Sequence, residues 1–211
     1  TNAQVVDFAD VVFLAVKPQF LEEVLDEIKD NVKEGQIFIS IAPGKTLQWL
    51  GEHLGEGTKI IRTMPNTPAM VGEGMTALCV NDLVTEEETA LAVKLCNTFG
   101  KSEVIPEHLM DAVVGVSGSS PAYVFMFLEA MADAAVADGM PRAQAYKFAA
   151  QAVLGSAKLM LETGKHPGEL KDMVCSPAGT TIEGVRILEQ NGFRSAVFEA
   201  LQGAADKGKK M

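Results

Sequence analysis

The chain has 211 residues, of which 47 % are hydrophobic and 6 % aromatic, and its formal net charge is −10. This length and apolar content predict a folded protein with one large aliphatic core or two small ones, and they argue against disorder. The acidic balance argues against nucleic acid or an anionic membrane as a partner, because both require a basic surface.

Strands and helices alternate in the first half of the chain. A β-branched run over residues 11–16 predicts a buried strand, and apolar residues at helical spacing predict a helix over 20–29. Strands are predicted over 36–41 and 60–64, with a helix over about 47–54 between them. This order predicts a parallel, Rossmann-like α/β sheet with right-handed crossovers.

The segments that follow the three strands are candidate binding loops, because ligands of such sheets bind at the carboxyl ends of the strands. These segments are Ala15-Val16-Lys17-Pro18, Ser40-Ile41-Ala42 and Met64-Pro65-Asn66-Thr67-Pro68. We expect them to line one crevice. From the residues alone, Lys17 could equally be a solvated lysine, Ser40 a turn or helix cap, and Arg62 a surface charge on an edge strand, which we leave outside the site.

The glycine-rich phosphate loop of dinucleotide-binding domains, G-x-G-x-x-G, is absent from the sequence. Gly72-Glu73-Gly74 and Gly115-Val116-Ser117-Gly118 do not replace it, because neither follows a strand with the required third glycine. We therefore expect the loop in residues that precede Thr1, and we interpret residues 1–106 as a partial dinucleotide-binding domain.

The pattern becomes helical after a domain boundary that we place near Pro106, and residues 107–211 are predicted to form an all-helical substrate-binding and dimerisation domain. Before the boundary we expect a strand over 75–80, a helix through 86–99 and a short strand near 104. After it, a helix over 111–116 leads to a predicted loop, 117–121, which opens a long helix with Ser120 as cap and Pro121 in its first position. Further helices are predicted over 141–163 and 193–206.

The long helix is apolar on nearly every face from Ala122 to Val136. A helix of this kind must be covered on every face, so we expect a second subunit to bury it in a homodimer. A membrane span is disfavoured because Glu129, Asp133 and Asp138 interrupt the apolar run.

The three cysteines, Cys79, Cys96 and Cys175, are far apart and form no Cys-x-x-Cys pair. Their spacing predicts buried, reduced thiols and no metal site. Residues 1–16 lack the basic start and the cleavage signal of a secretory leader, so we expect a cytoplasmic protein.

A tight turn with small hydroxyl residues, Cys175-Ser176-Pro177-Ala178-Gly179-Thr180-Thr181-Ile182-Glu183-Gly184, immediately precedes an apolar-periodic helix. Free backbone N–H groups and the positive end of the helix dipole gather at such a helix start, and hydroxyl groups add donors. The turn is therefore either a site for a carboxylate or phosphate or simply a well-capped helix, since Ser and Thr are ordinary cap residues.

The turn is flanked by His166-Pro167-Gly168-Glu169-Leu170-Lys171-Asp172 and by Leu188-Glu189-Gln190-Asn191-Gly192-Phe193-Arg194. Together these segments closely resemble pyrroline-5-carboxylate reductase, and the resemblance extends over nearly the whole chain. It implies reduction of the cyclic imine 1-pyrroline-5-carboxylate to L-proline, the last step of proline biosynthesis, by hydride from NADPH or NADH. It also implies a homodimer, and relatives often assemble into a decamer of five dimers.

The resemblance assigns roles to individual residues. Ser176, Gly179, Thr180 and Thr181 would bind the substrate, with the Thr181 hydroxyl on the ring nitrogen as the catalytic contact. Asn2 and the first two loops would contact the dinucleotide, and the third loop would border the nicotinamide. These cofactor residues are Asn2, Ala15, Val16, Lys17, Pro18, Ser40, Ile41, Ala42, Pro65 and Asn66. His166 is interpreted as structural, and Gly164 stands where some relatives have a substrate-contacting glutamate.

Two alternatives remain at this stage. A β-hydroxyacid dehydrogenase would share the architecture but would need a lysine on the long helix, and no lysine follows its entry at Ser119. The chain could also act only as an oligomerisation module, since tight cofactor binding is not expected without the glycine loop.

Overall fold

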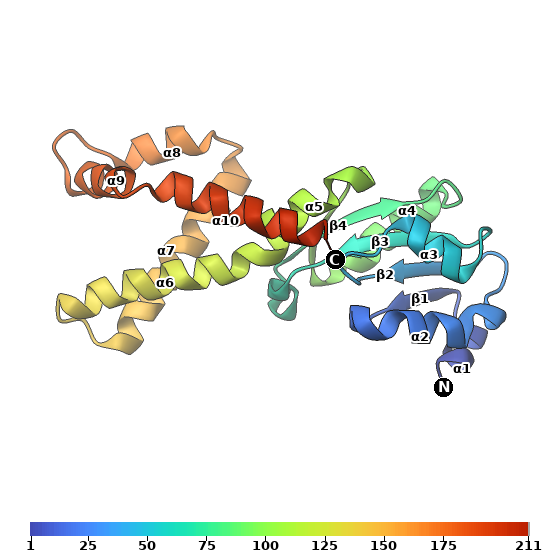
Figure 1. The fold of residues 1–211 in the computed structure, drawn as a ribbon. Helices are drawn as coiled ribbons and strands as arrows, with labels where there is room; N and C mark the ends of the chain where they lie inside the picture. Colours follow the sequence, from blue (N-terminus) through green and yellow to red (C-terminus); the bar gives the residue numbers. More distant parts are fainter. Residues whose placement is uncertain (211) are drawn as a thin grey trace. The chain divides into compact units, whose positions relative to one another are not determined.

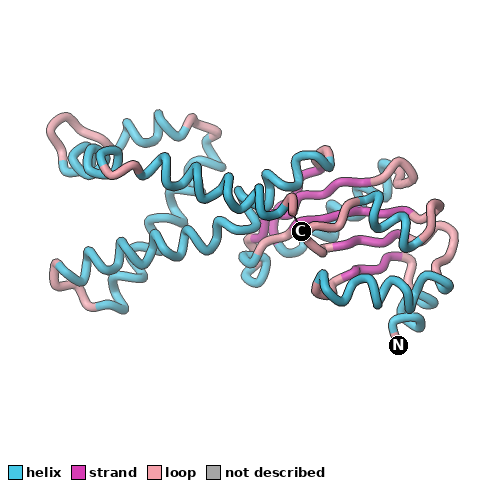
Figure 2. The backbone as a smooth tube through the Cα atoms, in the orientation of Figure 1, coloured by secondary structure: helices cyan, strands magenta, loops and turns pink. Residues whose placement is uncertain are grey.

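The computed structural model describes residues 1–210, which divide into two compact units. Unit 1 consists of residues 1–121 together with 200–210, and unit 2 consists of residues 122–199. Figure 2 shows that every strand lies in unit 1, whereas unit 2 is made of helices and their connections. The predicted division at residue 106 stays a prediction.

Five strands form one mixed sheet in the order β1-β2-β3-β4-β5 (Figure 1). The strands are β1 (Val11–Leu14), β2 (Ile37–Ser40), β3 (Lys59–Met64), β4 (Gly74–Val80) and β5 (Gly100–Val104). The predicted parallel pairing is confirmed for β1, β2 and β3, but β4 runs antiparallel to β3. The reason is the short connection through the 3₁₀ turn η2 (Thr67–Val71), because a parallel crossover needs a dozen or more residues.

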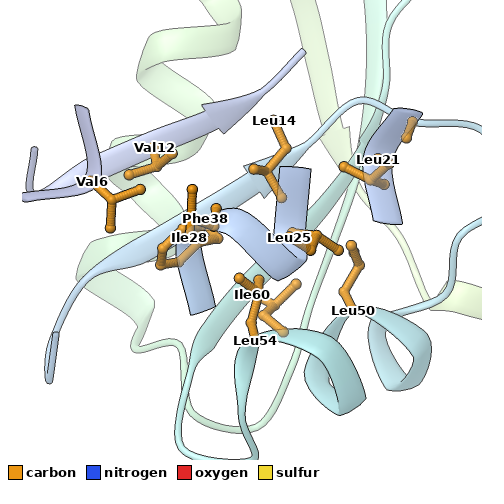
Figure 3. Close-up of a cluster of buried hydrophobic side chains, with 11 residues drawn as sticks. Val6, Val12, Leu14, Leu21, Leu25, Ile28, Phe38, Leu50, Leu54 and Ile60 are labelled. Carbon is orange, nitrogen blue, oxygen red and sulfur yellow. The ribbon is translucent and has the colours of Figure 1, made fainter. Parts of the chain in front are cut away.

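The helices of unit 1 cover both faces of the sheet. They are α1 (Asn2–Phe8), α2 (Pro18–Ile28), α3 (Leu47–Leu54), α4 (Glu86–Cys96) and α5 (Met110–Val113), with 3₁₀ turns η1 (Lys29–Asn31), η3 (Asn97–Phe99) and η4 (Glu107–Leu109). Alternate residues of a strand point to opposite faces, so Phe38 packs against α2 and α3 (Figure 3), whereas Ile39 packs in a second cluster with α4. This sandwich of helix, sheet and helix fixes the strand ends rigidly.

The predicted loop at residues 117–121 is wrong, because these residues belong to a helix. Chain 107–137 is helical throughout, and Val114–Ser119 forms a π-helical turn, η5, directly before α6 (Ser120–Ala137). Serine followed by proline is a common helix start, but proline inside a helix removes a backbone N–H and displaces the carbonyl four residues earlier. Here Pro121 is accommodated by the π-helical turn.

Unit 2 is built from α6, α7 (Arg142–Thr163), α8 (Pro167–Val174), α9 (Thr180–Gln190) and the first half of α10 (Phe193–Gly208). The predicted end of α7 at Gly164 is confirmed, and that glycine has the left-handed φ of +64°. Pro141, predicted to start α7, instead occupies the cap position before it.

Helix α6 leaves large apolar side chains exposed, including Phe125 at 62 % and Met126 at 67 %. By length and composition alone, the helical stretch Glu107–Ala137 could cross a membrane. However, Glu129 and Asp133 lie on it, and a membrane span would have to bury both charges. The exposed apolar surface therefore needs another cover.

Candidate active site

The loops after β1, β2 and β3 leave the sheet at the same edge. Leu14 pairs with Ser40, and Ser40 pairs with Arg62, so the carboxyl ends of the three parallel strands are in register. The Ile41 N–H donates to the Leu14 carbonyl at 3.2 Å, which extends the pairing into the loops. The structure thus places the three sequence-predicted loops together in unit 1.

The first loop contributes to a small cleft of about 90 Å³ that also contains Asn2. Asn2, Ala15 and Val16 all line this cleft. The Asn2 side chain donates to Glu27 Oε2 at 2.6 Å, and this contact holds α1 against α2. Lys17 is exposed at the cap of α2, whose first residue is Pro18.

A buried serine, Ser40, stabilises the second loop. Ser40 is fully buried, its Oγ accepts a hydrogen bond from Ala42 N at 3.3 Å, and its carbonyl accepts one from Thr63 Oγ1 at 3.0 Å. The hydroxyl therefore shapes the turn, as the cap interpretation of Ser40 expects. Ala42 is also buried, which leaves Ile41 and the backbone as the accessible part of this loop.

The third loop contains Asn66, whose side-chain amide joins two other segments. Asn66 Nδ2 donates to the Ser117 carbonyl at 3.1 Å, and its Oδ1 accepts from Met75 N at 2.9 Å. The asparagine is half-buried between the end of β3, the start of β4 and the π-helical turn. Sequence patterns indicated only a pocket wall here.

Arg62 corrects the sequence-based interpretation, because it is not a surface charge on an edge strand. It lies in the middle strand of the sheet, is 7 % exposed and pairs through Nη1 with Glu107 Oε1 at 3.0 Å. The same carboxylate oxygen accepts from Leu47 N at 2.8 Å, at the start of α3. The sequence offered one indication of this burial. Arg62 is a single charged residue inside a β-branched run, and such a run predicts a buried strand.

The pKa of the Cys79 thiol, which lies near this ion pair, is also shifted. Burial raises the pKa of Cys79 to about 12, and the Glu107 carboxylate adds to this shift. Cys79 and Cys96 are buried thiols as predicted, whereas Cys175 is only half-buried. Within residues 1–210, no group of three or more His, Cys, Asp or Glu side chains is placed to hold a metal ion.

The Ser176–Thr181 turn in unit 2 leads into α9 without a side-chain cap. Gly179 occupies the cap position, and no side chain accepts from the first N–H groups of the helix. The interpretation of this turn as a helix capped by its hydroxyl residues is therefore wrong. The uncapped N–H groups of α9 remain available to an anion.

The backbone of this turn is closely constrained. Ala178 has a φ of +56°, which non-glycine residues rarely adopt. A Cβ atom on Gly179 would lie 2.3 Å from Ser176 Oγ and 3.1 Å from the Ser176 carbonyl oxygen, so a larger residue here would displace that hydroxyl. Ser176, Thr180 and Thr181 are exposed in this turn. His166, predicted to be structural, caps α8 by accepting from Gly168 N at 3.1 Å through Nδ1.

A sheet whose parallel strands end in aligned loops at one edge is the arrangement found in dinucleotide-dependent oxidoreductases. Consistent with this class, residues 1–44 match the family model described as NADP oxidoreductase, coenzyme F420-dependent. Residues 107–211 match the model described as pyrroline-5-carboxylate reductase dimerisation.

Whole-chain comparisons agree with these matches. Pyrroline-5-carboxylate reductase of Escherichia coli is 59 % identical over 208 residues, which cover 99 % of this chain and 77 % of the relative. The solved structure of the Coxiella burnetii enzyme has a TM-score of 0.94 at 35 % identity and is covered over 78 % of its length, with all of this chain aligned. The Plasmodium falciparum enzyme, solved with NADP bound, has a TM-score of 0.92 at 33 % identity. The alignment covers all of this chain and 80 % of that enzyme. The chain belongs to the pyrroline-5-carboxylate reductase family of NAD(P)H-dependent oxidoreductases.

Proposed function

We propose that this chain reduces 1-pyrroline-5-carboxylate to L-proline with hydride from NADPH or NADH. The observation that carries the proposal is the uncapped start of α9 behind a turn of small hydroxyl residues. A helix N-terminus of this kind favours a small carboxylate, and the substrate carries one beside its ring nitrogen. Family membership supports the reaction type.

In this proposal the first N–H groups of α9 and the Ser176 hydroxyl hold the substrate carboxylate. The Thr181 hydroxyl hydrogen-bonds the ring nitrogen, while Thr180 and Gly179 complete the turn. A protonated cyclic imine is already strongly electrophilic, so the protein contributes mainly by orienting it. No powerful acid is required of the turn.

The nicotinamide cofactor supplies the hydride when bound. The residues proposed to hold it are Asn2, the loop Ala15–Pro18, the loop Ser40–Ala42, and Pro65 with Asn66. These residues fit a dinucleotide, since their loops leave three parallel strands at one edge and since Ala15 and Lys17 are exposed there. The accessible backbone beside Ala15 and Ile41 suits close approach of the cofactor.

The test is NADPH oxidation, followed by absorbance, with and without pyrroline-5-carboxylate. It is run on the chain as printed and on a fusion in which a glycine-rich dinucleotide-binding segment is added before Thr1. Thr181→Ala should lower turnover about a hundredfold with little change in dinucleotide binding, because one transition-state donor is lost. The matched control Thr89→Ala removes a hydroxyl that bonds only the Thr85 carbonyl, and it should leave turnover unchanged. Equal turnover of the Thr181 and Thr89 variants would contradict the assigned role.

We also propose that the protein is a homodimer and that five such dimers assemble into a decamer. Support comes from the exposed apolar side chains of α6 and from an apolar cleft of about 580 Å³ between α6, α7 and α8. Sedimentation velocity at micromolar concentration should give the mass of a dimer or of a multiple of it. Phe125→Glu, on the exposed face, should shift the population toward monomer, whereas a monomeric unmodified chain would refute the assembly.

We further propose that the enzyme works in the cytoplasm without a metal ion, since buried free thiols suit a reducing compartment.

A further inference from the structure

The π-helical turn of unit 1 ends directly before a Ser-Pro pair, and the proline removes a main-chain donor from the helix. Pro121 has no N–H, so it cannot donate to the Ser117 carbonyl in an α-helical register or to the Val116 carbonyl in a π-helical one. Side chains take both places. Ser120 Oγ donates to the Val116 carbonyl at 2.5 Å, and Asn66 Nδ2 donates to the Ser117 carbonyl at 3.1 Å.

Asn66 comes from the loop after β3, 51 residues earlier in the chain. Its Oδ1 simultaneously accepts from Met75 N at 2.9 Å, so one amide connects the end of β3, the start of β4 and the π-helical turn. The two segments also pack directly. A Cβ atom on Gly118 would lie 2.8 Å from Met64 Cε, so the turn approaches the strand end as closely as a glycine allows.

We propose that Asn66 is a positioning residue that fixes the loop Met64–Pro68 by supplying the donor that Pro121 removes. This inference rests on the proposed function, in which that loop borders the nicotinamide. Because this amide bonds both segments, the loop cannot shift without losing a hydrogen bond to the Ser117 carbonyl, whose α-helical donor position is occupied by Pro121. Both polar atoms of the Asn66 amide are engaged within the protein, so Asn66 acts on the reaction through Pro65 and the loop backbone, and its proposed contact with the dinucleotide is made by its backbone.

The experiment compares Asn66→Ala with a matched control, Asn81→Ala. Asn81 makes the same pair of bonds at the opposite end of β3, donating to the Thr58 carbonyl at 2.9 Å and accepting from Ile60 N at 3.2 Å. We expect Asn66→Ala to lower kcat about tenfold with less than about a threefold change in KM for NADPH, because small displacements of reacting groups are costly. The kinetic isotope effect with NADPH deuterated at the transferred position should rise. Asn81→Ala should leave both readouts unchanged.

Rescue by Pro121→Ala separates this role from general destabilisation. Alanine at 121 restores an N–H for the Ser117 carbonyl, so the loss in kcat on removing Asn66 should shrink from about tenfold to about twofold in that background. Asn66→Asp keeps the oxygen that accepts from Met75 N but loses the donor to the Ser117 carbonyl. It replaces Asn66→Ala in the test if the alanine variant folds poorly, and it should lower kcat by a similar factor. Equal effects of Asn66→Ala in both backgrounds, or an equal loss in Asn81→Ala, would overturn the proposal.

Amide hydrogen exchange gives a readout that does not depend on catalysis. Exchange across residues 114–123 should accelerate in Asn66→Ala and not in Asn81→Ala. If the unsubstituted chain with the added glycine-rich segment shows no imine-dependent oxidation, the proposed function fails whatever the exchange result. If it is active and exchange at the turn is unchanged by Asn66→Ala, only the positioning role fails.

Discussion

Replacing Glu107 by glutamine should destabilise unit 1 more than any change at an exposed ion pair. Glutamine keeps an oxygen that can accept from Leu47 N, so the substitution mainly removes the negative charge opposite Arg62. The side chain of Arg62 is 9 % exposed and that of Glu107 is 32 % exposed. The arginine would therefore remain charged in a largely dry position without its partner.

The expected cost follows from this burial. Removing one partner of a fully buried pair costs roughly 3–5 kcal/mol, because the remaining charge is desolvated without compensation. The partial exposure of Glu107 lets water reach the vacated position, so we expect about 2–3 kcal/mol for Glu107→Gln. For a chain of this size, this corresponds to a decrease in Tm of roughly 4–12 °C.

Trp49 provides the assay, since it is the single tryptophan and lies on α3 beside the Glu107 contact. Urea unfolding followed by its fluorescence measures the stability of unit 1. The matched control, also in unit 1, is Asp26→Asn, which removes a pair with Lys29 at 3.0 Å in which the side chains are 61 % and 49 % exposed. That pair should contribute little to stability, because water screens both charges.

The reasoning would be refuted if Glu107→Gln and Asp26→Asn lowered the free energy of unfolding equally. A double variant, Arg62→Met with Glu107→Gln, should recover part of the loss, because it no longer buries an unpaired charge. A double variant as unstable as the sum of its single variants would mean that the two side chains do not interact.

Two further predictions use the titratable groups. At pH 8, iodoacetamide should modify Cys175 in the native protein but reach Cys79 and Cys96 only in urea, because burial raises the pKa of both thiols; modification of Cys79 as fast as that of Cys175 would contradict this. Lys59 donates a hydrogen bond to Glu88 at 2.5 Å, and this bond lowers the pKa of the Glu88 carboxyl. The stabilisation by the ionised carboxylate is therefore present above the unfolded pKa of about 4.3. It is lost as the pH falls through the lower folded pKa. Glu88→Gln should flatten the fall in urea midpoint below pH 4.3, and an unchanged slope would argue against it.

Local patterns predicted most of the fold. The strands and helices of the first half follow from apolar runs and from the 3.6-residue period, which depend only on neighbouring residues. The antiparallel direction of β4 depended on the length of one connection. The helical state of residues 117–121 could not be predicted, because serine followed by proline indicates a helix start equally well. In the structure, Asn66 donates a hydrogen bond to the Ser117 carbonyl of this helical stretch, and no local pattern reveals a contact between residues so far apart.

The same distinction separates the parts of the candidate site. The Ser176–Thr181 turn was found from sequence because its chemistry belongs to backbone N–H groups and adjacent residues, which lie within a few positions of one another. Arg62 was missed because its partner, Glu107, lies 45 residues away, and a charged residue in a predicted strand gives no indication of which carboxylate it meets. Both pairings that sequence reasoning missed, Arg62 with Glu107 and Asn66 with Ser117, tie a strand to the helical stretch that begins at Glu107. Substitutions that weaken that stretch should therefore affect the loops at the carboxyl edge of the sheet even though they alter no residue predicted to touch the cofactor.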